Sequence, residues 1–197
     1  MILLALVPAA YALGMFPSAA IVARASGVDI TTQGSGNPGA SNVSRVLGWK
    51  RGVLVFALDA AKGAIAAGAA WAIDGRHAGY ICAAAAIVGH MFPVLRRFGA
   101  KRFQGGKGVA TGGGAMFVLQ PIVTPALLVV WFAISKVTKK ASVASIAIIP
   151  LLPIGAALLG APAWEIVAIV VLGVVVLLKH TSNIKRLLNK EELTLER

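Results

Sequence analysis

The chain has almost none of the residues that form disulfides or bind metals. It contains one cysteine, Cys82, which lies inside an apolar run, together with three histidines and only seven acidic residues among 197. A lone cysteine cannot form an internal disulfide, and so few potential ligands argue against a metal centre. We therefore expect no metal and no cofactor.

Long polar segments are also scarce. With 58% hydrophobic residues and a mean hydropathy of +0.83, the chain is too apolar for a soluble domain of its size. Several runs could span the roughly 30 Å hydrocarbon core of a bilayer. They are residues 2–23, 52–73, 78–95, 121–137, 142–159 and 163–179. We therefore predict one all-α, membrane-embedded domain over residues 1–197, with no soluble second domain.

A shorter apolar piece, 108–119, is too short to cross the bilayer unaided at ~1.5 Å per residue. It is either a broken helix shielded by its neighbours or a span that includes the preceding loop. The first run, 2–23, is interpreted as a span and not as a signal peptide, because its positive charge follows the apolar residues. Ala23-Arg24-Ala25 loosely resembles a cleavage site, which keeps processing open as the alternative.

Positive charge is concentrated on one predicted side of the membrane. All but Arg76 and Lys62 of the 19 lysines and arginines fall into four clusters. These are Arg24, Arg45, Lys50 and Arg51; Arg96, Arg97, Lys101, Arg102 and Lys107; Lys136, Lys139 and Lys140; and Lys179, Lys185, Arg186, Lys190 and Arg197. The clusters occupy alternate loops only if 108–119 crosses, so we predict seven spans with the N-terminus outside and the C-terminus cytoplasmic. The net charge of +12 thus reflects orientation and anionic headgroups, not nucleic acid.

The first glycine-rich segment, GSGNPGASNVSR, covers residues 34–45. Asn37-Pro38 predicts an N-cap followed by proline at the first position of a short helix that runs to about Leu47. Ser35, Gly36 and Asn37 would then lie at a helix N-terminus, which favours an anion. Arg45 lies too far along the helix to join the cap, so it would act from the other side of a bound group. A simple turn with a capped interfacial helix is the competing interpretation.

The second segment, QGGKGVATGGG at 104–114, places Lys107 between Gly106 and Gly108, immediately before an apolar run. Glycine lets backbone N–H groups approach an oxyanion closely, and the lysine adds positive charge. The pattern is not a Walker loop, because Gly108 follows the lysine where Ser or Thr is required. The competing interpretation makes Lys107 one more topology charge, and Gly112 to Gly114 a flexible or close-packed start of a span.

Other polar residues also fall near the predicted cytoplasmic face. Asp59 and Lys62 lie three residues apart and can neutralise each other within the membrane, so we interpret them as structural support. Ser142 begins an apolar run and could be an N-cap. His180 and Asn183, again three apart, end the last run, where a lone histidine is usually interfacial.

Six motifs together resemble those of a known family. GSGNPGASNVSRVLG, LDAAKG, GHMFPVLRRF, QGGKGVAT, SVASI and HTSNIKRLL, in this order and spacing, closely resemble the bacterial acyl-phosphate-dependent glycerol-3-phosphate acyltransferase family. The resemblance implies transfer of a fatty acyl group from acyl phosphate to the C1 hydroxyl of sn-glycerol 3-phosphate. The products are lysophosphatidic acid and phosphate, in the first step of bacterial phospholipid synthesis. It also implies a seven-span protein of the bacterial inner membrane with a cytoplasmic-facing active site, in contact with membrane lipid and not with nucleic acid.

The resemblance also implies roles for individual residues. Five are expected to be catalytic, namely Ser35, Arg45, Lys107, His180 and Asn183. The substrate-binding set is Gly36, Asn37, Gly39, Ser41, Asn42, His90, Gly105, Gly106, Gly108, Thr111 and Ser142. Within these sets, glycerol 3-phosphate is held by Arg45, Lys107, Ser142, His180 and Asn183, and acyl phosphate by residues 35–42 and 105–108. Small departures from the family pattern are Ser41 for threonine, Gln104 for a cation, and Thr181-Ser182 for a more polar pair.

Acyl phosphate is a mixed anhydride with a good leaving group, so direct transfer needs no covalent acyl-enzyme. The absence of a GxSxG elbow and of a cysteine near the inner face agrees with that. Either histidine, His90 or His180, or a substrate phosphate oxygen could accept the proton, and we slightly favour the substrate. A transporter of a phosphorylated solute is the main alternative, although the polar motifs gather at one membrane face and no internal repeat is evident. A non-catalytic scaffold would leave both glycine segments without a role.

Overall fold

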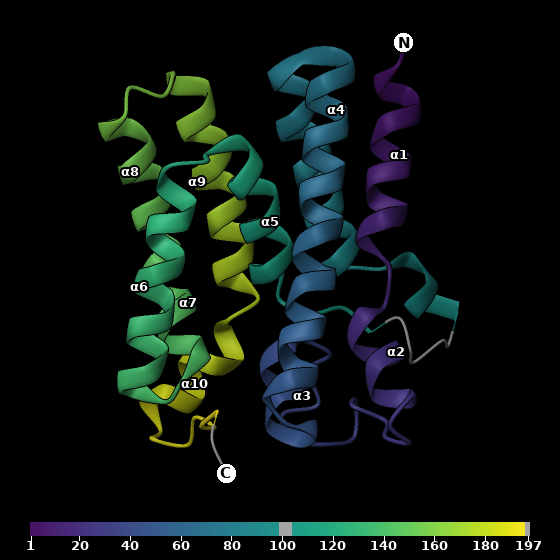
Figure 1. Cartoon of the computed structure of the whole chain (residues 1–197), viewed down its shortest axis with the longest axis vertical. Coiled ribbons are helices and arrows are strands. Elements are labelled where there is room, and N and C mark those ends of the chain that lie inside the picture. Colours follow the sequence, from purple (N-terminus) through teal and green to yellow (C-terminus); the bar gives the residue numbers. More distant parts are fainter. Residues whose placement is uncertain (99–103, 196–197) are drawn as a thin grey trace. The chain divides into compact units, whose positions relative to one another are not determined.

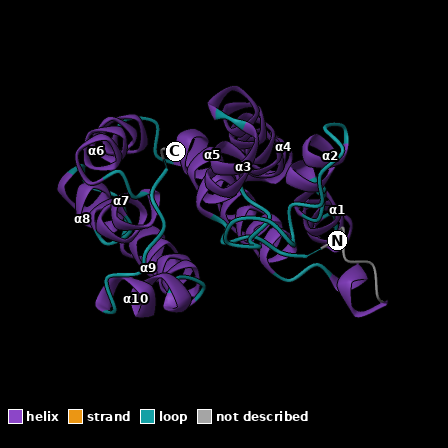
Figure 2. Ribbon diagram, turned by 90° about the horizontal axis from the view of Figure 1, so that it is seen from below, coloured by secondary structure: helices purple, strands orange, loops and turns teal. Residues whose placement is uncertain are grey.

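The computed structural model describes residues 1–98 and 104–195. All regular secondary structure in these two ranges is helical, as Figures 1 and 2 show, which confirms the all-α prediction. The chain divides into two compact units, Met1–Leu119 and Gln120–Arg197, and each is considered by itself. The clustered cations Lys101, Arg102 and Arg197 lie outside the described residues.

The first unit contains α1 to α5. Its elements are α1 (Leu3–Gly14), α2 (Ser18–Arg24), α3 (Ala40–Leu47), α4 (Trp49–Met91), the 3-10 helix η1 (Val94–Phe98) and α5 (Val109–Leu119). The first apolar run is thus two helices, interrupted just before Ser18 by Pro17, which has no backbone N–H to continue the helix. Helix α1 is tied to the end of α4, because the Tyr11 hydroxyl donates to the Phe92 carbonyl oxygen over 2.7 Å.

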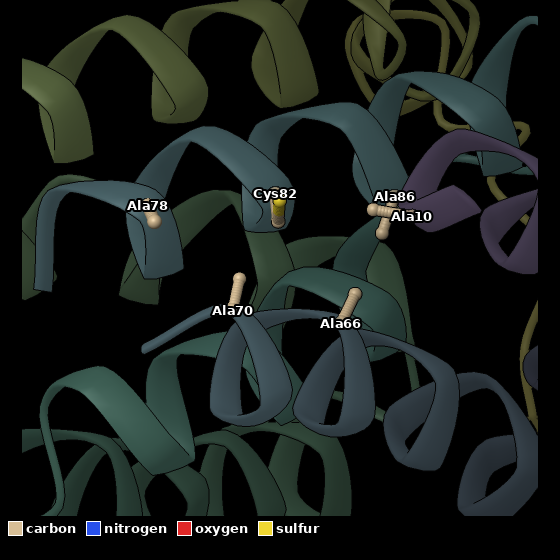
Figure 3. Close-up of a cluster of buried hydrophobic side chains, with 6 residues drawn as sticks. All are labelled: Ala10, Ala66, Ala70, Ala78, Cys82 and Ala86. Atoms are coloured by element: carbon tan, nitrogen blue, oxygen red, sulfur yellow. The ribbon is translucent and has the colours of Figure 1, made fainter. Parts of the chain in front are cut away.

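Helix α4 reverses direction at its middle. Asp74 and Gly75 have non-helical backbone angles, and Gly75 has φ 80°, a region that favours glycine. The two halves pack together through small side chains, drawn in Figure 3. The cluster comprises Ala66 and Ala70 from the first half, Ala78, Cys82 and Ala86 from the second, and Ala10 from α1. Small residues let helix backbones approach closely, so the second and third predicted spans form one helical hairpin.

Helix α5 packs against the first half of α4. A β-carbon at Gly63 would collide with the Thr111 carbonyl oxygen, and one at Gly114 would collide with the Ala60 carbonyl oxygen. By contrast, Gly113 has open space on the side where a β-carbon would lie. Of the three consecutive glycines that begin this apolar run, Gly114 is therefore required for close packing and Gly113 is not.

The second unit contains the remaining helices, which are α6 (Val123–Thr138), α7 (Ala141–Ile148), α8 (Leu151–Leu158), α9 (Ala163–Leu178) and α10 (Thr181–Leu188). Helix α6 packs against α7 and α8, and α8 packs against α9. The Trp131 indole donates to the Ser145 hydroxyl over 3.0 Å, which fixes α6 to α7. A buried polar pair, Gln120 and Glu165, lies 2.8 Å apart. After α10 the tail returns to the α6–α7 turn, where Leu195 N–H donates to the Lys139 carbonyl oxygen.

Three helical stretches of the described residues are long and apolar enough to cross a membrane, namely Leu3–Arg24, Trp49–Arg96 and Ala141–Leu158. The bent pair of α9 and α10, with 57° between its parts, brings the number to four if it is counted as one span. Shorter apolar helices are Val109–Leu119 and Val123–Thr138. Seven crossings and the orientation of the termini stay predictions.

Candidate active site

Asn42 organises the first glycine-rich segment. Its side chain is buried, and its Oδ1 accepts hydrogen bonds from Ser35 N–H over 2.9 Å and from the Arg45 guanidinium over 3.2 Å. Its amide nitrogen donates to the carbonyl oxygens of Ile30 and Gln33. One amide therefore uses both its donor and its acceptor ends, and it fixes Arg45 relative to the loop that carries Ser35.

The predicted N-cap of this segment, Asn37, is wrong by two residues. Helix α3 begins at Ala40, and the first helical hydrogen bonds are accepted by Gly39, which makes Gly39 the N-cap instead of Asn37. The N–H groups of Gly36 and Asn37 bond inside the loop, to the Gln33 carbonyl oxygen and the Ser35 hydroxyl. Because these N–H groups are engaged locally, the side chains of Ser35 and Arg45 are the better candidates for contacting an anion.

The second glycine-rich segment lies against the end of α4. Gly106 N–H donates to the His90 carbonyl oxygen over 3.1 Å. A β-carbon on Gly105 would collide with the Met91 carbonyl oxygen, and one on Gly106 would collide with the His90 ring. Gly108 has φ 86°, after which α5 begins. Lys107 is thus held on a short loop that only glycine can build at this distance from α4.

A buried polar cluster contacts His90, the residue against which that loop lies. Lys62 Nζ lies 2.8 Å from Asp59 Oδ1, which confirms the predicted pair, and it also lies 2.7 Å from His90 Nδ1 and 3.1 Å from the Phe16 carbonyl oxygen. An ammonium has three hydrogens and no lone pair, so Lys62 donates to His90 Nδ1 and to the Phe16 carbonyl oxygen, and it pairs with the Asp59 carboxylate through its charge. Nδ1 of His90 is therefore an acceptor, and Nε2, which faces Gly106, carries the proton. Sequence reasoning did not place His90 in this cluster, because it comes from the returning half of α4.

An open pocket adjoins both glycine segments in the first unit. Its lining includes Pro38, Gln104, Gly106, His90 and Asp59, together with residues 14–20 at the break between α1 and α2. The buried Ser18 hydroxyl in this wall makes no hydrogen bond within the described parts of the chain. The pocket therefore offers polar groups to a small ligand at the place where the two segments meet.

In the second unit, Ser142 and Asn183 converge on a residue that sequence reasoning missed. Glu192 Oε1 accepts from the Ser142 hydroxyl over 2.7 Å and from the Asn183 amide over 2.6 Å, and Oε2 accepts from Arg186 Nε over 2.8 Å. Burial raises the pKa of Glu192, but these three hydrogen bonds and the Arg186 charge outweigh burial and hold the pKa below its usual value. Ser142 is not the N-cap of α7, since Lys140 takes that position. The available signal for Glu192 was its rarity as one of seven acidic residues in a basic chain.

His180 occupies the N-cap position of α10 and is buried. Its Nδ1 lies 2.8 Å from the Val176 carbonyl oxygen, which can only accept, so Nδ1 carries the proton in the neutral ring. Nε2 is then the basic nitrogen. The two candidate histidines therefore have opposite tautomers. His180 presents a lone pair at Nε2, whereas His90 presents a hydrogen there.

The predicted residues thus gather in three places within the separate units. In one place, hydrogen bonds join Ser35, Asn42 and Arg45. In another, His90 bonds to Lys62, which is paired with Asp59. Ser142 and Asn183 share the Glu192 carboxylate. Thr111 is fully buried in α5, and its hydroxyl makes no hydrogen bond among the described residues, so its expected role in substrate binding stays a prediction.

Comparison with known proteins identifies relatives over nearly the full length of the chain. The family model described as glycerol-3-phosphate acyltransferase matches residues 4–190. A glycerol-3-phosphate acyltransferase from Bacillus velezensis is 35% identical over 98% of this chain and 97% of the relative. One from Clostridioides difficile is 40% identical over 93% of this chain and 90% of the relative.

Solved structures agree with the sequence relatives. The crystal structure of PlsY, an integral membrane glycerol 3-phosphate acyltransferase, in its glycerol 3-phosphate form superposes with a TM-score of 0.90 at 37% identity. The alignment covers 98% of this chain and 96% of that one. The lysophosphatidic acid form of the same enzyme gives a TM-score of 0.89 at the same identity.

Proposed function

The chain belongs to the glycerol-3-phosphate acyltransferase family, and on that premise we propose that it transfers a fatty acyl group from acyl phosphate to the C1 hydroxyl of glycerol 3-phosphate. Relatives with this name cover almost the whole chain, and the matching solved enzyme exists in glycerol 3-phosphate and lysophosphatidic acid forms. The products are lysophosphatidic acid and phosphate. Both units are parts of one membrane-embedded acyltransferase domain.

The single observation that carries this proposal is the Lys107 loop. Its glycines lie directly against His90 and Met91, and a buried ion pair holds His90 from the other side. Such support fixes the backbone of the loop that carries Lys107, and Gln104 and Gly106 of the same loop line the pocket. Preorganised donors of this kind stabilise the negative charge that develops on the acyl carbonyl oxygen and on the leaving phosphate.

For the remaining residues we propose the roles that the family resemblance implies. Arg45, Lys107, Ser142, His180 and Asn183 are assigned to glycerol 3-phosphate, and Ser35 with the two glycine segments is assigned to acyl phosphate. Lys107, as part of the second glycine segment, serves both substrates. Holding two reactants in a productive geometry can lower the barrier by roughly 7–11 kcal/mol, which removes the need for a covalent intermediate.

The attacking C1 hydroxyl must lose its proton. A substrate phosphate oxygen is our first choice of acceptor, and His180 is the second because its basic nitrogen is Nε2 in the neutral tautomer. His90 is a poor base, since its Nε2 carries a hydrogen while Lys62 occupies Nδ1. Substituting His180 by Gln decides between the two. A large loss of kcat with unchanged glycerol 3-phosphate affinity would assign the base to His180.

The proposed location is the bacterial inner membrane, with seven crossings and the active site on the cytoplasmic face. The reversal of α4 supports this count, because it supplies two antiparallel segments within one continuous helix. In the first unit the reversal and the N-terminus lie at one end, and α3 lies at the other (Figure 1). Single cysteines placed in 24–51, 96–107, 136–141 and 180–197, after replacement of Cys82, should all be labelled from the cytoplasmic side. Labelling of 96–107 and 136–141 from opposite sides would refute seven spans.

The activity test uses purified protein in detergent with acyl phosphate, glycerol 3-phosphate and a chelator. We expect release of phosphate and formation of lysophosphatidic acid at equal rates, and no loss of rate with chelator. A parallel reaction with acyl-CoA as donor should be inactive, which separates the acyl phosphate proposal from acyl transfer in general. Accumulation of glycerol 3-phosphate in sealed vesicles, without lipid product, would support the transporter alternative instead.

A further inference from the structure

The pocket of the first unit is built at a break in a candidate membrane span. Leu3–Arg24 is long and apolar enough to cross a membrane, yet α1 ends at Gly14 and α2 begins only at Ser18. Pro17, just before α2, has non-helical backbone angles. Non-helical backbone at membrane depth is tolerated only where it is buried in protein or lines a water-filled cavity. Here residues 14–20 line the pocket, so the break in the span belongs to the pocket wall.

Two buried oxygen atoms of residues that line this pocket accept or donate no hydrogen bond within the described parts of the chain. They are the Ser18 hydroxyl oxygen and Asp59 Oδ1, and the two residues are 1% and 3% exposed. Lys62 neutralises the charge of Asp59, but its hydrogen bonds go to His90 and to the Phe16 carbonyl oxygen. Unsatisfied buried polar atoms are costly and rare, so two of them at one pocket indicate a ligand that bonds to both.

The chemistry of the two oxygen atoms selects the kind of ligand. The Asp59 carboxylate oxygen can only accept a hydrogen, whereas the Ser18 hydroxyl can donate one. A phosphate dianion brings only acceptors, and the carboxylate would repel it. An alcohol hydroxyl brings one hydrogen and two lone pairs, so it can donate to Asp59 and accept from Ser18 at the same time. The pocket therefore suits a neutral hydroxyl group and not an anion.

We propose that this pocket binds the C2 hydroxyl of glycerol 3-phosphate, with Ser18 donating to its oxygen and Asp59 Oδ1 accepting its hydrogen. This inference rests on the proposed function, because it takes glycerol 3-phosphate as the acyl acceptor. Pro38 and Gly106 also line the pocket, so it adjoins both glycine segments, which are assigned to acyl phosphate. Binding of the C2 hydroxyl here keeps that group from attacking and leaves the adjacent C1 hydroxyl to receive the acyl group.

The first test compares two acceptors with the wild-type protein, so it needs no variant to fold. 1,3-Propanediol monophosphate keeps the attacking hydroxyl and the phosphate of glycerol 3-phosphate but lacks the C2 hydroxyl. Sites built to bond a hydroxyl reject analogues that lack it, because the buried polar groups then stay unsatisfied. We expect kcat/KM to favour glycerol 3-phosphate by roughly tenfold or more. Equal kcat/KM values for the two acceptors would overturn the proposal.

The second test removes the hydroxyl with Ser18→Ala, and Ser135→Ala is its matched control. Both serines are buried, with a hydroxyl that makes no hydrogen bond among the described residues, but Ser135 comes from α6 and is not part of the pocket lining. Without substrate, neither variant should melt below wild type, because each loses an unsatisfied polar group. Ser18→Ala should lose about three- to tenfold in kcat/KM for glycerol 3-phosphate and less than about twofold for the analogue. Ser135→Ala should match wild type with both acceptors.

Binding gives a readout that does not depend on turnover. Glycerol 3-phosphate should raise the Tm of wild type and of Ser135→Ala more than that of Ser18→Ala, whereas the analogue should raise all three equally. Equal losses of Ser18→Ala with both acceptors would show that Ser18 bonds only to water, and a clear drop in its Tm without substrate would show a structural role. Either result would overturn the proposal. Absence of acyl transfer in the wild-type protein would instead refute the proposed function itself.

Discussion

Replacing Gly114 by alanine measures how closely α5 must approach α4. The new β-carbon would collide with the Ala60 carbonyl oxygen, a backbone atom that no rotamer change can move. The neighbouring Gly113→Ala is the matched control, because nothing lies within 4 Å of its β-carbon position. Both changes replace glycine within the same helix, so the difference between the two variants isolates the packing.

The magnitudes follow from two opposing contributions. Alanine in a helix interior is favoured over glycine by about 1 kcal/mol, so Gly113→Ala should be neutral or stabilising by up to that amount. Overpacking costs about 1–3 kcal/mol, so Gly114→Ala should be less stable than Gly113→Ala by that amount. For a chain of this length, each kcal/mol corresponds to roughly 2–4 °C in Tm.

Thermal unfolding in detergent, followed alongside turnover, checks this expectation. Gly114→Ala should also reduce kcat, because a shift of α5 moves Lys107 at the start of that helix, and misplaced catalytic groups are costly. Gly63→Ala should behave like Gly114→Ala, since its β-carbon would collide with the Thr111 carbonyl oxygen from the opposite side of the same contact. If Gly114→Ala melts at or above the temperature of Gly113→Ala, the close approach of the helices is not a constraint and the reasoning fails.

Three further predictions concern the polar sites. Lys107→Ala should lower kcat by about 10²-fold or more, with little rescue by Lys107→Arg, while the exposed Lys136→Ala keeps wild-type turnover. Asn42→Asp replaces a donor that bonds two carbonyl oxygens by a carboxylate that repels them, so kcat/KM should fall about tenfold or more and the melting temperature should drop. Because the pKa of Glu192 is lowered in the folded protein, its stabilising effect is present above the usual value of 4.5 and is lost as the pH falls through the lower folded-state value. The melting difference between wild type and Glu192→Gln should therefore close on acidification.

Local spacing predicted some of the site. Asp59 and Lys62 lie three apart on a helix, and the structure pairs them over 2.8 Å. Their third partner, His90, could not be predicted from spacing, because it depends on where the chain reverses. The reversal at Gly75 places His90 and Lys62 at similar distances from the turn on facing halves of α4, and only then does the ammonium reach the ring.

The first glycine segment illustrates why a local rule failed. Asn37-Pro38 fits the statistics for a helix start, yet the helix begins two residues later. The side chain that orders the segment is Asn42, which bonds backward to Ile30 and Gln33 as well as to Ser35. Capping preferences consider only the residues next to a helix start. They therefore miss Asn42, whose side-chain amide lies within the helix and bonds back to the preceding loop.

Buried acids explain how this basic chain can place its donors accurately. Asp59 pairs with Lys62, which bonds to His90 in one unit, and Glu192 pairs with Arg186 and accepts from Ser142 and Asn183 in the other. Burying a charge is costly unless several hydrogen bonds satisfy it, and inside an apolar protein those bonds are strong and directional. Most of the 19 cations belong to the clusters that predict the orientation in the membrane, so we expect neighbouring cations to compensate for the loss of one. The chain has only seven acidic residues, so no neighbouring acid can replace a buried carboxylate that is lost. We therefore expect substitution of the buried carboxylates to disturb substrate positioning more than substitution of most cations.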